Sequence, residues 1–166
     1  MTDATTAPAR TPATRLRDMI RQVNSLADHV PHDVVAFAAR LFPAVVFWQS
    51  ARTKVDGFTI KDSTYFLFEQ VYALPLIPPV PAAVLATVAE HVLPVLLILG
   101  LFSRFSALGL LVMTAVIQIF VFPGAWVTHG LWAAALLVVL AQGPGRLSAD
   151  YLLGLDRGRG QRDVAF

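Results

Sequence analysis

Four long apolar segments constrain this chain more than any other feature. They cover residues 33–51, 81–101, 104–122 and 126–143. At 1.5 Å per residue each forms a helix of about 27–32 Å, which is long enough to cross the hydrocarbon core of a bilayer. Only 14% of the residues are charged, whereas soluble domains carry about 25%. The sequence therefore predicts an all-α fold, a four-transmembrane-helix bundle whose main partner is the lipid bilayer.

The basic residues predict how this bundle is oriented. Four spans place both termini on one side of the membrane, and the side with more Lys and Arg usually faces the cytoplasm. The side that holds the termini carries Arg10, Arg15, Arg17, Arg21, Arg104, Arg146, Arg157, Arg159 and Arg162, and the other side carries Arg52, Lys54 and Lys61. We therefore expect both termini in the cytoplasm. The same clustering at the chain ends gives no basic recognition helix, so a nucleic-acid partner is not expected.

Three segments flank or connect the spans. Residues 1–14 are rich in Thr, Ala and Pro and predict a disordered tail, and residues 155–166 form a basic cytoplasmic tail. Residues 15–32 predict an amphipathic helix on the anionic bilayer surface, because apolar residues recur every three or four positions and Arg residues lie off that stripe. A solvated helix that binds a partner is the alternative. In the loop 52–80, residues 63–73 predict a short periplasmic helix that lies at the interface or dips into the bundle.

Two charged residues fall inside the spans and are functional candidates for that reason. Arg40 lies about 10 Å, and Glu90 about 16 Å, from the inner surface if each helix is straight. A difference of about 6 Å is within reach of an Arg side chain. We expect Arg40 and Glu90 to form an ion pair. It either serves function or only orients the helices, and Arg40 could instead extend to the inner surface.

A second polar group gathers near the outer ends of the spans. It contains Trp48, Gln49, Arg52, Lys54, Gln118, Trp126, His129 and Trp132. With Glu90 these residues predict a polar cavity that opens outward. An ordinary aromatic belt explains the Trp residues but not Glu90 or Gln118. No metal site is expected, because His29, His32 and Asp33 at the membrane entry are typical interfacial residues, and the sequence has no Cys.

The order of these signals resembles the DoxX family of small four-span membrane proteins. The resemblance rests on FWQSARTK at the end of the first span, AEHVLPVLLILGLFSRFSALGLLVM across the second and third, and GPGRLSADYLLG after the fourth. It covers about residues 36–154. The positions that match the family's recurrent polar residues are Arg40, Lys54, Glu90, Arg104, His129 and Asp150, whereas Ala51 replaces the usual Gly.

The resemblance implies a protein of the bacterial cytoplasmic membrane that is linked to redox processes. The family includes a membrane subunit of thiosulfate:quinone oxidoreductase and components of oxidative- or metal-stress systems. We therefore expect, at most, a subunit of a quinone-linked oxidoreductase, with a pocket for a quinone or a small sulfur compound. Because the chain has no Cys, it cannot carry out dithiol–disulfide exchange alone.

Each candidate residue has an expected role in that pocket. Glu90 and His129 are the catalytic candidates, with Glu90 exchanging protons. Arg40, Lys54, Gln118 and His129 would supply hydrogen bonds or charge, and Trp48 and Trp132 would flank a quinone ring. The alternatives are a carrier of a small anion or metal ion and an anchor for a soluble redox or stress-response partner. A homodimer through Ala107 and Gly109 is a further expectation.

Overall fold

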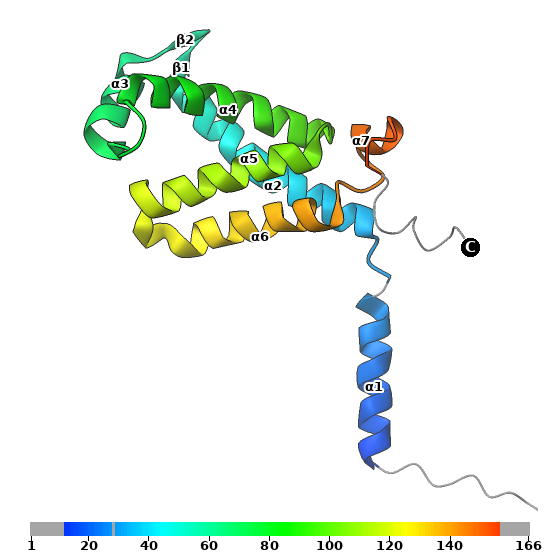
Figure 1. The fold of residues 1–166 in the computed structure, drawn as a ribbon. Coiled ribbons are helices and arrows are strands. Elements are labelled where there is room, and N and C mark those ends of the chain that lie inside the picture. The colour runs from blue at the N-terminus through cyan, green and yellow to red at the C-terminus, as the bar shows by residue number, and fades with distance from the viewer. Residues whose placement is uncertain (1–11, 28, 157–166) are drawn as a thin grey trace, which may run out of the picture. The chain divides into compact units, whose positions relative to one another are not determined.

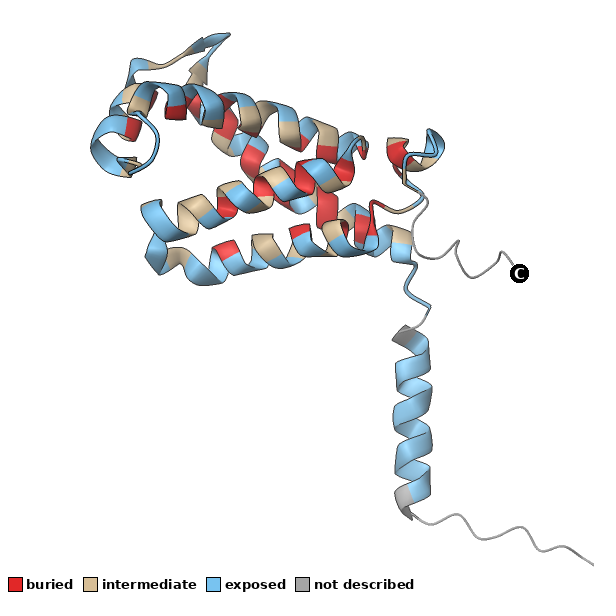
Figure 2. Ribbon diagram, viewed as in Figure 1, coloured by how far each residue is buried: buried red, intermediate tan, exposed pale blue. Residues whose placement is uncertain are grey.

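The computed structural model describes residues 12–27 and 29–156. Helix α1 (Pro12–Ala27) belongs to one compact unit, and all later elements belong to a second. The side chains of residues 14–26 are all exposed (Figure 2). Helix α1 begins before the predicted start at residue 15, and the predicted end at residue 32 is already the start of the next helix. Residues 1–11 of the predicted tail and residues 157–166 lie outside the described part of the chain.

The second unit is built on the four predicted apolar helices (Figure 1). They are α2 (His32–Lys54), α4 (Pro79–Leu99), α5 (Ser103–Val116) and α6 (Trp126–Gln142). A π-helical turn, η2 (Ile117–Val121), extends α5, and a 3-10 turn, η3 (Pro123–Ala125), precedes α6. With these two turns included, each of the four is long and apolar enough to cross a membrane. Helix α2 begins and α6 ends at one end of the bundle, called here the His32 end; the opposite end is the Lys54 end.

Small side chains are frequent inside this bundle, and many large apolar side chains lie on its outside. Ala36, Ala44 and Ala51 are fully buried along α2, whereas Phe42 and Phe105 are 69% exposed. Bundles in lipid favour this pattern, because small residues let helices approach closely and lipid tails solvate the large ones. Figure 2 shows the buried positions along the helix contacts.

The two small residues predicted to form a dimer are used inside the chain. Ala107 is fully buried in the core. A Cβ atom on Gly109 would lie 2.7 Å from Cδ1 of Leu93, so this glycine allows α5 to pack against α4. Both residues are therefore accounted for by contacts within the bundle.

The long connection at the Lys54 end is more ordered than the sequence predicts. It contains an antiparallel pair of two-residue strands, β1 (Val55–Asp56) and β2 (Thr59–Ile60), then α3 (Asp62–Leu67) and a π-helical turn, η1 (Phe68–Tyr72). The predicted helix 63–73 thus begins one residue earlier and changes to π-helical form. It dips onto the bundle, because Phe68 packs with Ala82 and Ala83 of α4.

Candidate ligand cavity

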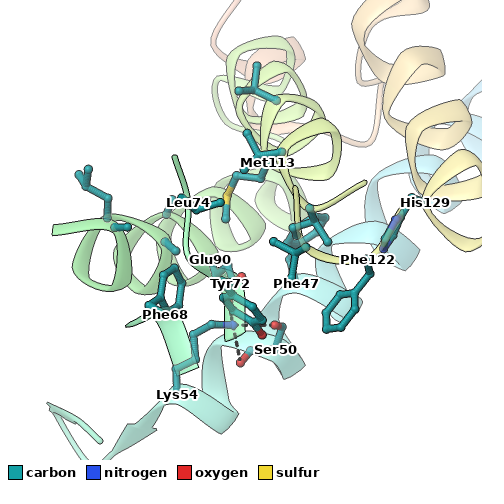
Figure 3. Close-up of a pocket in the computed structure, with 18 of the residues that line it drawn as sticks. Phe47, Ser50, Lys54, Phe68, Tyr72, Leu74, Glu90, Met113, Phe122 and His129 are labelled. Carbon is teal, nitrogen blue, oxygen red and sulfur yellow. Dashed lines mark hydrogen bonds and ion pairs between the residues drawn. The ribbon is translucent and has the colours of Figure 1, made fainter. Parts of the chain in front are cut away.

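A cavity of about 340 Å³ lies in the Lys54 half of the bundle. Its walls come from α2, α4, α5, α6 and the two π-helical turns, and most of the lining is aliphatic or aromatic. Figure 3 shows the labelled side chains around this space. The polar groups among them are few: Ser50, Lys54, Tyr72, Glu90 and His129. A mostly apolar cavity with a few placed polar groups is the usual form of a small-molecule site.

A buried ion pair lies in the cavity wall. Lys54 Nζ is 2.7 Å from Glu90 Oε2, and the two side chains are only 8% and 4% exposed. Lys54 Nζ also donates a hydrogen bond of 2.9 Å to Ser50 Oγ (Figure 3). Because neither charge is solvated by bulk water, each depends on the other for stabilisation. The pair therefore places a donor and an acceptor at the surface of a mostly apolar space.

The local fold fixes the position of Lys54. It is the last residue of α2, where a positive charge is favoured by the negative end of the helix dipole. Its carbonyl accepts hydrogen bonds from the Lys61 backbone N–H at 3.1 Å and from Thr64 Oγ1 at 2.8 Å. The short strand pair between these residues thus ties the end of α2 to α3, and the Lys54 side chain turns toward α4.

The expected pairing of Arg40 with Glu90 is wrong. Arg40 Nη1 donates to the carbonyls of Leu97 and Ile98 at 3.2 Å each, and Nη2 donates to the carbonyl of Leu147 at 2.6 Å. Leu97 and Ile98 lie seven and eight residues beyond Glu90, or about 10–12 Å farther along α4. The carbonyls in the last turn of a helix lack their regular partners four residues on, so they can accept from the N–H donors of a guanidinium. The Leu97 carbonyl also accepts from the Gly100 N–H at 3.2 Å.

Arg40 instead belongs to a cluster at the His32 end, called here the end clamp and formed by Arg40, Gly100, Ser148 and Asp150. The Asp150 carboxylate accepts hydrogen bonds of 2.8 Å from the backbone N–H groups of Phe102 and Ser103, and so caps the start of α5. The Asp150 N–H donates to the carbonyl of Gly100 at 2.8 Å. These bonds fasten the segment after α6, which includes α7 (Ala149–Leu152), to the ends of α4 and α5.

His129 and Gln118 form a second polar pair at the cavity. Gln118 Nε2 donates to the Pro123 carbonyl at 2.7 Å, which leaves its Oε1 as the acceptor for His129 Nδ1, also at 2.7 Å. In a neutral imidazole this arrangement puts the hydrogen on Nδ1 and leaves Nε2 as an acceptor. Trp132 lies beside it, with ring centroids 5.0 Å apart. Both His129 and Trp132 line the cavity, and Gln118 orients the imidazole from behind.

The structure brings some of the predicted site residues together and separates others. Lys54, Glu90, His129 and Trp132 line one cavity. Trp48 does not line it; its ring contacts His91, with centroids 5.4 Å apart. Residues that follow Arg40 at steps of four, such as Trp48 and Arg52, do not stay on one face of α2, because each step of four residues turns 400° and so moves the side chain about 40° around the helix. The buried face of α2 alternates steps of four and three residues: Arg40, Ala44, Phe47, Ala51 and Lys54. Trp48 and Arg52 fall outside this face and are exposed.

Several cavity residues were not singled out from the sequence. Ser50 lies four residues before Lys54 and so shares its side of α2. Phe68 and Tyr72 are also four residues apart, in the segment that was predicted to dip into the bundle. Their spacing was a usable signal. Met113 and Phe122 carry no pattern that separates them from neighbouring apolar residues that face outward.

Two π-helical turns border the cavity. Phe68 and Tyr72 come from η1, and Ile117 and Val121 come from η2. The Tyr72 ring meets the Phe122 ring edge to face, with centroids 6.0 Å apart, and so joins the two turns. Single π-helical turns are frequent at functional sites, because they shift side chains out of the regular helical register.

Tyr72 lies outside the four spans and keeps its proton at neutral pH. Burial raises the pKa of its phenol, and the negative charge of Glu90 raises it further. Tyr72 is therefore a neutral hydroxyl that can donate a hydrogen bond into the cavity.

The fold and the cavity define a multi-pass membrane protein with four apolar helices. The family model DoxX matches residues 35–123, which is more than half of the chain, and the chain belongs to the DoxX family. The match includes Arg40, Lys54 and Glu90 and ends before His129 and Asp150. No curated protein and no solved structure gives a significant match.

Proposed function

We propose that this DoxX-family protein is a redox-associated membrane subunit that binds a quinone in the cavity. The observation that carries the proposal is the Lys54–Glu90 ion pair in the wall of a mostly apolar space. A quinone combines an apolar ring with carbonyl oxygens that accept hydrogen bonds. Lys54 has three N–H donors, and its shortest bonds, to Glu90 and Ser50, use two of them. The third donates only a long bond, 3.5 Å, to the Ser50 carbonyl, and we expect a ligand carbonyl to replace that bond.

The aromatic lining suits the ring of such a ligand. Phe47, Phe68, Tyr72, Phe122 and Trp132 all contribute to the cavity surface. Phe47 and Trp132 already pack edge to face, with centroids 5.7 Å apart. Aromatic side chains favour offset or edge-to-face contacts with another flat ring. A ring among these side chains would lie beside Lys54 at one polar position and His129 at the other.

The charge of the site favours a quinone over an anionic sulfur compound. The positive charge of Lys54 is balanced by Glu90 at 2.7 Å, so the pair leaves little net attraction for an anion. An anion such as thiosulfate would also lose its hydration in a mostly apolar cavity. A neutral ligand does not depend on a net charge in the site and does not lose the hydration of an ion.

When bound, a quinone supplies two-electron, two-proton redox chemistry. In this proposal Glu90 accepts or returns a proton at Oε, and Lys54 and Tyr72 donate hydrogen bonds to the carbonyl oxygens. Because the chain has no Cys, a dithiol centre would have to belong to a partner subunit. The distribution of Lys and Arg supports a bacterial cytoplasmic membrane location in which the Lys54 end, and with it the cavity, faces outward.

The carrier alternative has no comparable support. Within residues 12–27 and 29–156, no group of three or more His, Cys, Asp or Glu side chains is placed to hold a metal ion. The ion pair also lacks the net charge that would draw a small anion into the bundle.

Quinone binding can be measured through Trp132. The chain has three Trp residues, so a Trp48→Phe/Trp126→Phe protein leaves Trp132 as the only indole, in the cavity wall. Decylubiquinone is expected to quench its fluorescence in a saturable way, and excess thiosulfate is expected not to relieve the quenching. Quenching that rises linearly without saturation, or that thiosulfate relieves, would contradict the proposal.

Tyr72→Phe tests the predicted donor in that assay. Loss of one neutral hydrogen bond is expected to weaken decylubiquinone binding by about three- to tenfold. Because the pKa of Tyr72 is raised above its ordinary value, this difference should stay constant from acidic pH to at least neutral pH. Tyr65→Phe removes a phenol that does not line the cavity and is the matched control. Equal affinities for the two variants would exclude Tyr72 as a ligand donor.

A further inference from the structure

Helix α1 has one continuous apolar face made of five large side chains. Leu16, Met19, Ile20, Val23 and Leu26 are 49–66% exposed. At 100° per residue they fall within an arc of about 120°, which is the width of a typical buried helix face. Burying this arc removes a large apolar area from water, so the face favours a partner.

The charges around this face match an anionic bilayer surface. Arg15 lies next to the Leu26 edge of the arc, Arg17 lies beyond the Ile20 edge, and Arg21 lies on the polar side. Asp18 is the only acidic residue of α1. Arg side chains on both flanks can reach lipid phosphates while the apolar arc enters the acyl region.

The chain also brings α1 close to a membrane. Only residues 28–31 separate Ala27 from His32, the first residue of the candidate span α2. The helix therefore needs no other tether to meet lipid headgroups. We propose that α1 binds flat on the surface of an anionic bilayer through its apolar arc, with the flanking Arg15 and Arg17 paired to lipid phosphates.

The full-length protein can report this binding because it has no Cys. Met19→Cys places a single thiol in the apolar arc, and Ser25→Cys places one on the opposite side as the matched control. Each is labelled with an NBD fluorophore in nanodiscs of phosphatidylcholine alone or with phosphatidylglycerol. In the anionic discs we expect a blue-shifted emission at position 19 that lipid-linked nitroxides quench, and a water-like emission at position 25.

The Arg residues are tested in the same discs. Each of Arg15→Gln and Arg17→Gln, made in the Met19→Cys protein, is expected to lower the ratio of bound to free helix by about fivefold. A water-like label at position 19 in both lipids would overturn the proposal. A shielded label that lipid nitroxides do not quench would also overturn it and would indicate a protein partner. Decylubiquinone binding, measured on the same variants, reports separately on the cavity.

Discussion

Lys54→Met alone is expected to destabilise the bundle by about 3–5 kcal/mol, because it leaves Glu90 without its partner in a buried position. Lys54→Met/Glu90→Met is expected to recover most of that loss, because an apolar pair of similar volume carries no desolvation cost. The free energy of unfolding, measured in detergent with increasing denaturant, checks both values. The ion pair thus contributes little net stability of its own.

The double variant separates structure from function. It is expected to fold and to lose saturable decylubiquinone quenching, because both the donor and the acceptor in the cavity wall are gone. The coupling between the two sites follows from the double-mutant cycle with Glu90→Met. Additive losses of stability, without recovery in the double variant, would show that the two side chains do not interact as the 2.7 Å contact indicates.

Gly100→Ala is expected to destabilise the protein by about 2–5 kcal/mol. Gly100 ends α4 at φ +69°, and an added Cβ would lie 2.5 Å from Ser148 Cβ and 2.8 Å from Ser148 Cα, besides meeting the Arg40 guanidinium. The end clamp has no room for it. Thermal unfolding in detergent measures the loss.

Gly154→Ala is the matched control for this substitution. Gly154 has nearly the same backbone conformation, φ +70°, but a Cβ there would have no atom within 4 Å. Gly154→Ala is therefore expected to lower the free energy of unfolding only by the backbone strain, about 1–2 kcal/mol. The difference between the two variants is the steric cost at the end clamp, and equal losses would contradict the close packing of Arg40, Gly100 and Ser148.

The spans could be predicted from sequence because length and apolarity alone decide them. The segments 33–51 and 81–101 differ from α2 and α4 by at most three residues at either end. Those three residues matter for the site, since the predicted first span ended before Lys54. A long side chain on the last residue of a span can turn back toward the bundle, and a count of depth from straight helices does not show it.

Arg40 illustrates what the sequence pattern could not show. Opposite charge predicts Glu90 as its partner, but in the structure the two terminal nitrogens of the guanidinium donate to three backbone carbonyls. Every residue has a backbone carbonyl, so the sequence does not show which carbonyls lack their regular partner at a helix end. The residues GPGRLSAD after the fourth span contribute to the family resemblance. Their role in the end clamp could not be predicted, because it depends on contacts between distant parts of the chain.

The quinone cavity is tested most directly by what the protein retains from its own membrane. Protein purified in mild detergent is extracted with organic solvent, and quinone is quantified by mass spectrometry. Ala86→Phe fills the cavity from α4, and Ala134→Phe adds the same bulk at an exposed position of α6. We predict stoichiometric quinone in the natural sequence and in Ala134→Phe, and its loss in Ala86→Phe. Quinone at the level of the bulk lipid in all three, or retained equally by Ala86→Phe, would contradict a quinone site in this cavity.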